Sequence, residues 1–304
     1  MCSCMVVNSG FLLVDKPAGI TSHDVVAVVR RAARTKRVGH AGTLDPFATG
    51  LLVLAVGPCT RLLPYIAGEP KLYEATIRFG EEMNTDDATG VVTRTASCPQ
   101  GAMLANARHP ELVAALAALT GTMQQVPPAF SAKHVNGQRA YHMARKGADL
   151  VLPPSTIRVM DWEWLGADGA DLQVRVTCGA GTYIRALARD LGRGLDSAAH
   201  CHALRRVASG PAHVADAVPM SALTPGAIAE GLIALHNPLG LLEEMAREVL
   251  DEEAVQQLRH GRAITASQRG ARAALVWQGN VVAMAQRIAG DRWQPKVVLL
   301  GDAA

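Results

Sequence analysis

The sequence predicts an α+β fold with a mixed or antiparallel sheet, followed by a small β-rich module. Strand and helix patterns occur in mixed order, without the regular strand–helix repeat that builds a parallel sheet. Two alternating segments, 156–165 and 171–177, flank a glycine-containing turn and predict a hairpin. Four prolines between residues 211 and 240 interrupt the helix and strand patterns before the last predicted strands. We therefore expect one domain over residues 1–235 and a β-rich module over residues 236–304.

The first part of the chain alternates apolar strands with one helix. Residues 11–16 predict a strand, and Ser22 is expected to cap a helix over residues 24–34. The continuous apolar run 51–56 is typical of a buried strand. Residues 71–80 alternate between a polar and an apolar face, as a strand with one side on a core does.

The middle of the chain continues the mixed pattern. Residues 111–119 predict a helix rich in Ala and Leu, and two consecutive prolines make 126–131 a rigid extended loop. A tight turn over 179–182 opens a helix over residues 183–193, and 203–209 predicts a further strand.

The β-rich module combines one helix with three strands. The helix over 251–260 ends at Gly261, and strands are expected near 272–278, 281–288 and 296–300. A module of about sixty residues is barely stable without a neighbour.

The composition is that of a folded chain with a sizeable core. Its 304 residues are 49% hydrophobic and 19% charged, with a net charge of +3. This charge excludes a long basic tail and by itself says little about nucleic acid. Basic side chains nevertheless form one cluster and one pair: Arg30, Arg31, Arg34, Lys36, Arg37, Arg205 and Arg206. They predict either a phosphate-binding surface or a solvated helix face.

Signals for targeting and for metal binding are weak. The N-terminus has no signal-peptide pattern and no apolar run approaches the ~20 residues of a membrane span, so we expect a cytoplasmic protein. Six cysteines follow no framework spacing and are expected to be reduced thiols. His200, Cys201 and His202 are adjacent, but zinc-ligand pairs usually have residues between them and no partner pair occurs elsewhere. We therefore expect no metal site.

The most informative stretch is the glycine-rich loop 38–50, which carries an imidazole, a carboxylate and two hydroxyls. It runs directly into the buried strand that follows, which is how folds hold a polar group rigidly at a cleft. Taken singly, its residues have ordinary explanations. Asp45 precedes a proline as turn residues do, and loop backbone can satisfy His40. Tyr73 alone predicts a core tyrosine, and Arg185 alone a surface arginine.

The joint pattern resembles the TruB-type tRNA pseudouridine synthases in five segments that occur in the same order. These lie between residue 11 and about residue 215: 11–20 with Lys16, Pro17 and Gly19; 40–50; 71–74; 127–132 with Gly137, Tyr141, Ala144, Arg145 and Gly147; and 181–185 with 190–192 and 204–206. The resemblance implies a pseudouridine synthase catalytic domain over 1–235. More loosely, it implies a PUA-like RNA-binding module over 236–304.

The same resemblance implies roles in catalysis. Asp45 would be the nucleophile, and Arg185 would pair with it and keep it ionised. Tyr73 would stack on the target base and assist proton removal at C5. Asp45 could attack the sugar or the base, or remove a sugar proton on the way to a glycal. The residue types do not choose among these routes.

Further roles concern the RNA. His40 would fill the gap left by a flipped base, and Tyr183 and Leu204 would line the uracil pocket. The basic side chains named above would line the RNA backbone, which favours a phosphate-binding surface over a solvated face. Asp87, in the matching acidic loop, is expected to be structural or on the RNA side rather than catalytic.

The implied activity is conversion of uridine-55 in the T-loop of tRNA to pseudouridine, without cofactor or guide RNA. The expected partner is the T-arm of tRNA, and we expect a monomer. One alternative is another uridine specificity, or guide-dependent action, on the same fold. Another is a non-catalytic RNA-binding protein or tRNA folding chaperone. A carbohydrate-active hydrolase is more distant, because it needs a second carboxylate as acid–base partner.

The chain departs from the family pattern at two places, and the second, at His134, concerns an RNA contact rather than the chemistry. Met83 and Asn84 replace a usual Thr-Asp pair in the acidic loop. His134 stands where a lysine is usual, with Lys133 one place early.

Overall fold

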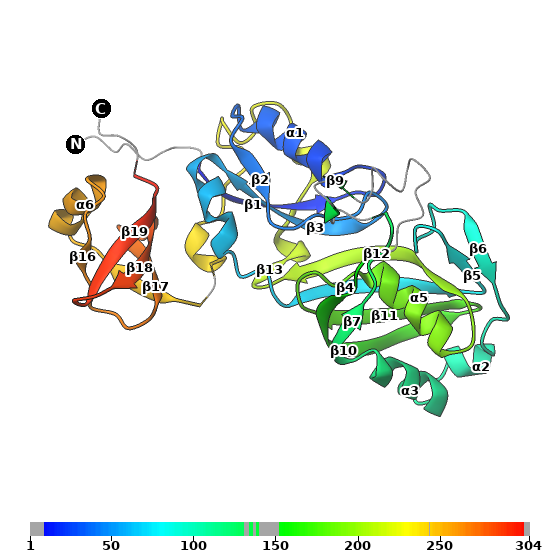
Figure 1. Ribbon diagram of the computed structural model, residues 1–304. Coiled ribbons are helices and arrows are strands. Elements are labelled where there is room, and N and C mark those ends of the chain that lie inside the picture. Colours follow the sequence, from blue (N-terminus) through cyan, green and yellow to red (C-terminus); the bar gives the residue numbers. More distant parts are fainter. Residues whose placement is uncertain (1–8, 131–133, 136–137, 140–151, 243, 301–304) are drawn as a thin grey trace. The chain divides into compact units, whose positions relative to one another are not determined.

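The computed structural model describes residues 9–130, 134–135, 138–139, 152–242 and 244–300, and it confirms the α+β fold (Figure 1). Contacts divide the chain into two compact units. The first unit is built from described residues within Met1–Pro46, Gly50–Gly68 and Gly210–Ala304. The second is built from those within Phe47–Thr49 and Glu69–Ser209. The expected boundary between residues 235 and 236 stays a prediction.

The first unit is organised around the antiparallel pair β1 (Gly10–Lys16) and β3 (Thr49–Val56). Strand β2 (Val38–His40) pairs with the end of β3, and β14 (Val218–Pro219) runs parallel to β1. Helix α1 (Ser22–Ala32) packs against these strands. One buried core joins its valines to both strands: Val25, Val26, Val29, Leu12 and Leu54.

The N-cap of α1 is Thr21, not Ser22 as the sequence predicts. The N–H of Asp24 donates to Thr21 Oγ1 at 3.1 Å, and the N–H of Thr21 donates to Asp24 Oδ2 at 2.8 Å. This reciprocal capping box needs an acidic side chain three residues after the cap, and Thr21 meets that condition. Ser22 is buried instead, with its hydroxyl turned inward.

The second unit contains an antiparallel sheet with the strand order β12, β4, β11, β10, β7. Its strands are β4 (Lys71–Phe79), β7 (Gly121–Gln125), β10 (Ser155–Asp168), β11 (Asp171–Cys178) and β12 (Ala199–Ser209). The predicted hairpin is confirmed by the pairing of β10 with β11. The predicted alternation in β4 is also confirmed, because every second residue from Tyr73 to Phe79 is buried.

Helix α5 (Ile184–Gly194) contacts β12 and β4, and Figure 1 shows it lying across these strands. Two smaller helices, α2 (Gly101–Leu104) and α3 (Pro110–Ala118), belong to the same unit. Strands β5 (Glu81–Met83) and β6 (Val92–Thr95) form a short hairpin that the sequence does not predict.

A separate five-stranded sheet confirms the β-rich character of the C-terminal part. Its elements are β15 (Ala246–Val249), α6 (Glu252–Arg259), β16 (Ile264–Thr265), β17 (Arg272–Trp277), β18 (Asn280–Ile288) and β19 (Arg292–Val298). The buried Glu248 carboxylate accepts hydrogen bonds from Trp293 Nε1 at 2.7 Å and from the N–H groups of Ser267 and Gln268. These bonds offset the cost of burying the charge and tie three segments together.

The other elements of the described residues are η1 (Gly57–Tyr65), β8 (His134–Val135), β9 (Gln138–Arg139), β13 (Ala212–His213), η2 (Val214–Asp216), η3 (Met220–Ala222) and η4 (Pro238–Gly240). Among the described residues, no helix combines the length and the apolar character that crossing a membrane requires. Several residues of the family-like central segment lie outside the described residues: Ser131, Ala132, Lys133, Gly137, Tyr141, Ala144, Arg145 and Gly147.

Candidate active site

A buried lysine holds one side of the loop that carries Asp45. Lys16, at the end of β1, is 0% exposed. Its Nζ donates to the carbonyls of Pro17 at 3.0 Å, Ile20 at 2.8 Å and Pro46 at 3.2 Å. Burying an ammonium is costly unless it is hydrogen-bonded, so these carbonyls fix its position. Lys16 thereby ties the residue after Asp45 to the turn that follows β1.

A serine holds the other side of the same loop. Ser22 Oγ accepts a hydrogen bond from the N–H of Leu44 at 2.9 Å and donates to the Leu44 carbonyl at 3.1 Å. The N–H of Gly19 donates to the Pro46 carbonyl at 2.8 Å. Both neighbours of Asp45 are thus anchored to the start of α1 and the turn before it. Asp45 itself is half-buried.

The other candidates of the first unit lie on β2 and at the end of α1. His40 is half-buried on β2, opposite Leu54 of β3. The basic cluster occupies the last turn of α1 and the loop after it, and all its members are exposed: Arg30, Arg31, Arg34, Lys36 and Arg37. Arg34 forms an ion pair with Glu230. The exposure of this cluster is the condition that a phosphate-binding surface has to meet.

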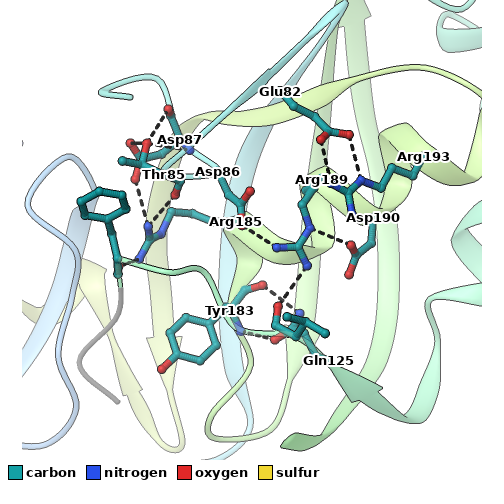
Figure 2. Close-up of polar contacts among 12 residues, drawn as sticks. Glu82, Thr85, Asp86, Asp87, Gln125, Tyr183, Arg185, Arg189, Asp190 and Arg193 are labelled. Atoms are coloured by element: carbon teal, nitrogen blue, oxygen red, sulfur yellow. Dashed lines mark hydrogen bonds and ion pairs between the residues drawn. The ribbon is translucent and has the colours of Figure 1, made fainter. Parts of the chain in front are cut away.

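In the second unit, Arg185 is buried in the first turn of α5 (Figure 2). Its Nη1 donates to the Thr85 carbonyl at 2.7 Å and lies 3.2 Å from Asp87 Oδ2, while Nη2 donates to the Phe130 carbonyl at 3.0 Å. A buried guanidinium needs such acceptors because its charge has left water. The expected pairing of Arg185 with Asp45, which belongs to the other unit, stays a prediction.

Asp87 is the carboxylate partner of Arg185 that the sequence analysis did not identify. Its Oδ1 accepts hydrogen bonds from Thr85 Oγ1 at 2.9 Å and from Thr89 Oγ1 at 2.6 Å. These bonds leave Oδ2 directed at Arg185. Asp87 is 4% exposed, a position that agrees with a structural role and does not fit an RNA contact.

Arg185 is the first of three arginines along one face of α5. Arg189 and Arg193 follow at intervals of four residues, which places the three side chains on the same side of the helix. Arg189 Nη1 lies 2.7 Å from Asp86 Oδ2, and Arg193 Nη2 lies 2.8 Å from Glu82 Oε2 (Figure 2). Each arginine therefore faces a different carboxylate of β5 or of the turn that follows it.

Two of the carboxylates that face the arginines of α5, Glu82 and Asp86, differ in their pKa. Burial opposes ionisation of Glu82, but hydrogen bonds from Arg193 and Arg94 outweigh it and lower its pKa to about 2. Burial raises the pKa of Asp86 to about 6, against the opposing effect of Arg189. Glu82 therefore stays ionised in mild acid, whereas Asp86 takes up a proton there.

The aromatic and apolar candidates occupy two neighbouring strands and the start of α5. Tyr73 is 7% exposed on the apolar face of β4. Leu204 on β12 lies opposite Ala75, so it is a diagonal neighbour of Tyr73 on the same face of the sheet. Tyr183 is half-buried at the N-cap of α5, two residues before Arg185. The structure thus brings Tyr73 close to Leu204, and Tyr183 close to Arg185.

Arg206 departs from the predicted RNA surface. It is 1% exposed and lies directly opposite Tyr73 in the ladder of β12 and β4. Arg205 is half-buried, and its Nη1 donates to Thr49 Oγ1 at 3.5 Å. Because a contact with RNA phosphates needs an accessible cation, Arg206 does not belong to that surface. Its burial follows from the strand register, which charge alone does not reveal.

The cysteines and the adjacent histidines do not form a metal site among the described residues, and His200 and Cys201 have other partners. Burial raises the pKa of Cys59 and Cys178 to about 11, which makes both thiols poor nucleophiles. In β12, His200 Nδ1 lies 3.0 Å from the Glu81 carbonyl, and Cys201 Sγ donates to the Ala203 carbonyl. Within the described part of the chain, no three His, Cys, Asp or Glu side chains are grouped as metal ligands would be.

Family models and related proteins both match this chain over most of its length. Residues 30–184 match the TruB family pseudouridylate synthase N-terminal domain, and residues 245–300 match the C-terminal domain of tRNA pseudouridine synthase II. The chain is 46% identical to tRNA pseudouridine synthase B of Leifsonia xyli, over 84% of each chain. It is 44% identical to the protein of that name from Thermobifida fusca, over 96% of this chain and 99% of that one.

Solved structures show the same fold. A chain in the crystal structure of a Cbf5–Nop10–Gar1 complex superposes with a TM-score of 0.71 at 23% identity, covering 97% of this chain and 86% of that one. Together with the sequence matches, the fold defines the protein as a pseudouridine synthase, which is an isomerase. Within that class, the chain belongs to the TruB family.

Replacing Ser22 with Ala should slow pseudouridine formation about tenfold, because the N–H and carbonyl of Leu44 lose this partner and the Asp45 loop shifts. The single-turnover rate on substrate RNA measures the effect. Thr21→Ala is the matched control, since it removes the helix cap worth about 1 kcal/mol, and the Thr21 hydroxyl bonds to Asp24 rather than to Leu44. Equal rates for the two variants would contradict the anchoring role of Ser22.

Replacing Glu82 with Gln should destabilise the fold in a pH-dependent way. The lowering of the Glu82 pKa from 4.5 to about 2 corresponds to about 3 kcal/mol of folding free energy. That contribution is present above about pH 4.5 and is lost as the pH falls towards 2, because the unfolded chain binds the proton first. Urea unfolding of both proteins across this range should show their difference shrinking in acid.

The control for this measurement is Glu230→Gln, which removes an exposed ion pair with Arg34. It should change the free energy of unfolding little at any pH. A pH-independent effect of Glu82→Gln would show that lost packing, not lost charge, destabilises the variant.

Proposed function

We propose that this enzyme converts uridine-55 in the T-loop of tRNA to pseudouridine, with Asp45 as the nucleophile. The observation that carries the proposal is the similarity to relatives named tRNA pseudouridine synthase B, over nearly the full length of one of them. The anchored loop supports the assignment of Asp45, because a nucleophile must be held within a fraction of an ångström of its productive position.

The reaction rearranges one nucleoside without adding or removing a group. The bond between uracil N1 and ribose C1′ breaks, the base turns, and C5 bonds to C1′. C5 then loses its proton and N1 gains one, so the product is an isomer of the substrate. Asp45 would act as an ionised carboxylate, by attack on the sugar or the base or by removal of a sugar proton.

The other site residues would orient the base and the carboxylate. Arg185 would direct Asp45 through charge-assisted hydrogen bonds, which gain strength in a pocket that excludes water. Tyr73 would stack on the uracil and assist removal of the C5 proton, and Leu204 beside it would line the pocket. Tyr183 would line the pocket from the start of α5. This set needs no cofactor.

The RNA would be held by exposed cations and by replacement of the flipped base. His40 would fill the space that the uracil leaves. The exposed cluster at the end of α1 would contact phosphates together with Arg205, and the C-terminal module would add a PUA-like contact. We expect one chain to act as a monomer, in the cytoplasm and without guide RNA.

Asp45→Asn should abolish turnover while the dissociation constant for tRNA changes by less than about tenfold, because the amide keeps the shape but cannot act as a nucleophile. The assay is tritium release from a tRNA transcript labelled at uridine C5. A second transcript has cytidine in place of the T-loop uridine. Release that persists in the variant would reject the nucleophile, and release from the second transcript would reject the target position.

Arg185→Lys should lower the single-turnover rate by about a hundredfold, because one ammonium cannot reproduce the fork that reaches Thr85, Asp87 and Phe130. Arg193→Lys is the matched control, since it makes the same substitution two turns later on α5, where the side chain is 56% exposed. A rate near that of the wild type for Arg185→Lys would refute its role in catalysis.

A further inference from the structure

Helix α5 holds both ends of the proline-rich segment that follows β7. Arg189 Nη2 donates to the carbonyl of Val126 at 3.0 Å, and Arg185 Nη2 donates to the carbonyl of Phe130 at 3.0 Å. The two prolines between them have no N–H to donate, so carbonyls are the groups through which this stretch can be anchored. The position of the segment and the direction of the Arg185 guanidinium are therefore coupled.

The residue before this segment is bonded to the start of α5. Gln125, at the end of β7, is 2% exposed. Its Oε1 accepts a hydrogen bond from the N–H of Tyr183 at 2.9 Å, and its Nε2 donates to the Tyr183 carbonyl at 3.0 Å (Figure 2). The oxygen and the nitrogen of the Gln125 amide thus both bond to the backbone of Tyr183. This pair fixes Tyr183 in place of a side-chain cap, which α5 lacks.

Gln125 also lies at the point where the connection from β7 to β10 begins. In the ladder of β7 and β10, Gln125 pairs with Ser155, so the connection between the two strands begins and ends at one residue pair of the sheet. Arg189 secures the first residue after that point, and Asp86 and Asp190 in turn hold Arg189 at 2.7 Å and 2.9 Å.

We propose that Gln125 and Arg189 are positioning residues for uridine isomerisation, acting through Tyr183 and Arg185. Gln125 sets the backbone of Tyr183, and Arg189 sets the proline-rich segment whose far end orients Arg185. This inference rests on the proposed function of Tyr183 and Arg185 at the uridine. Small displacements of such groups lower the rate of the chemical step more than they lower affinity for a large RNA.

The test compares isosteric variants with matched neighbours. Gln125→Glu keeps an acceptor for the Tyr183 N–H but sets a carboxylate against the Tyr183 carbonyl, whereas Gln125→Met removes both bonds without adding charge. Gln124→Glu is the control, because Gln124 is exposed on the same strand and its amide bonds to Thr156 on β10. Arg189→Lys is compared with Arg193→Lys on the same helix.

The readouts are the single-turnover rate of tritium release at saturating tRNA, the dissociation constant for tRNA, and the melting temperature. We expect Gln125→Glu, Gln125→Met and Arg189→Lys to lower the rate by about ten- to a hundredfold while the dissociation constant changes by less than about threefold. The two controls should keep the rate of the wild type. A purely structural role would lower the melting temperature and leave the rate of the folded fraction unchanged, which would overturn the proposal.

A double-mutant cycle tests whether Arg189 affects the rate through Arg185. If Arg189 acts through Arg185, then Arg189→Lys should cost much less in the Arg185→Lys background than in the wild type. Full additivity of the two effects would overturn that route. Absence of tritium release by the wild type would instead reject the proposed function and this role with it, whereas an active wild type with equally active variants would reject the positioning role alone.

Discussion

The burial of Arg185 is the constraint around which the second unit is arranged. A guanidinium removed from water needs both countercharge and hydrogen-bond acceptors, and an unmatched one costs several kcal/mol. The turn after β5 supplies Asp87 as countercharge, and two backbone carbonyls supply acceptors. Arg189 repeats the arrangement with Asp86, and the more exposed Arg193 adds an ion pair to Glu82, so α5 is joined to β5 and the turn after it at three points.

In the first unit, the loop that carries Asp45 is held in place by hydrogen bonds to its backbone rather than by ion pairs. Lys16 and Ser22 hold the Asp45 loop through backbone groups of Pro46 and Leu44. Backbone carbonyls are neutral, so this anchoring adds no negative charge beside Asp45. The loop is thereby held through its backbone on both sides of Asp45.

Local sequence patterns predicted the long helices and strands well, but they did not predict contacts between segments that are distant in the sequence. The alternation of β4, the hairpin of β10 with β11 and the position of α5 all followed from local strand patterns and turn residues. Strands β5 and β6 did not, because three or four residues carry too little periodicity to be recognised. Asp87 and Arg185 are 98 residues apart, and no local pattern pairs them. Arg206 was expected on the surface from its charge, but the register of β12 buries it.

The pairing of Gln125 with Ser155 has a consequence for how the family can vary. The chain between them closes a loop on two positions that are already neighbours in an antiparallel ladder. The entropy of closing such a loop rises only with the logarithm of its length, by about 0.6 kcal/mol for each doubling. A change in the length of the connection between these two strands therefore costs the sheet little. The pairing of β7 with β10 can stay in register while the number of residues that joins them varies.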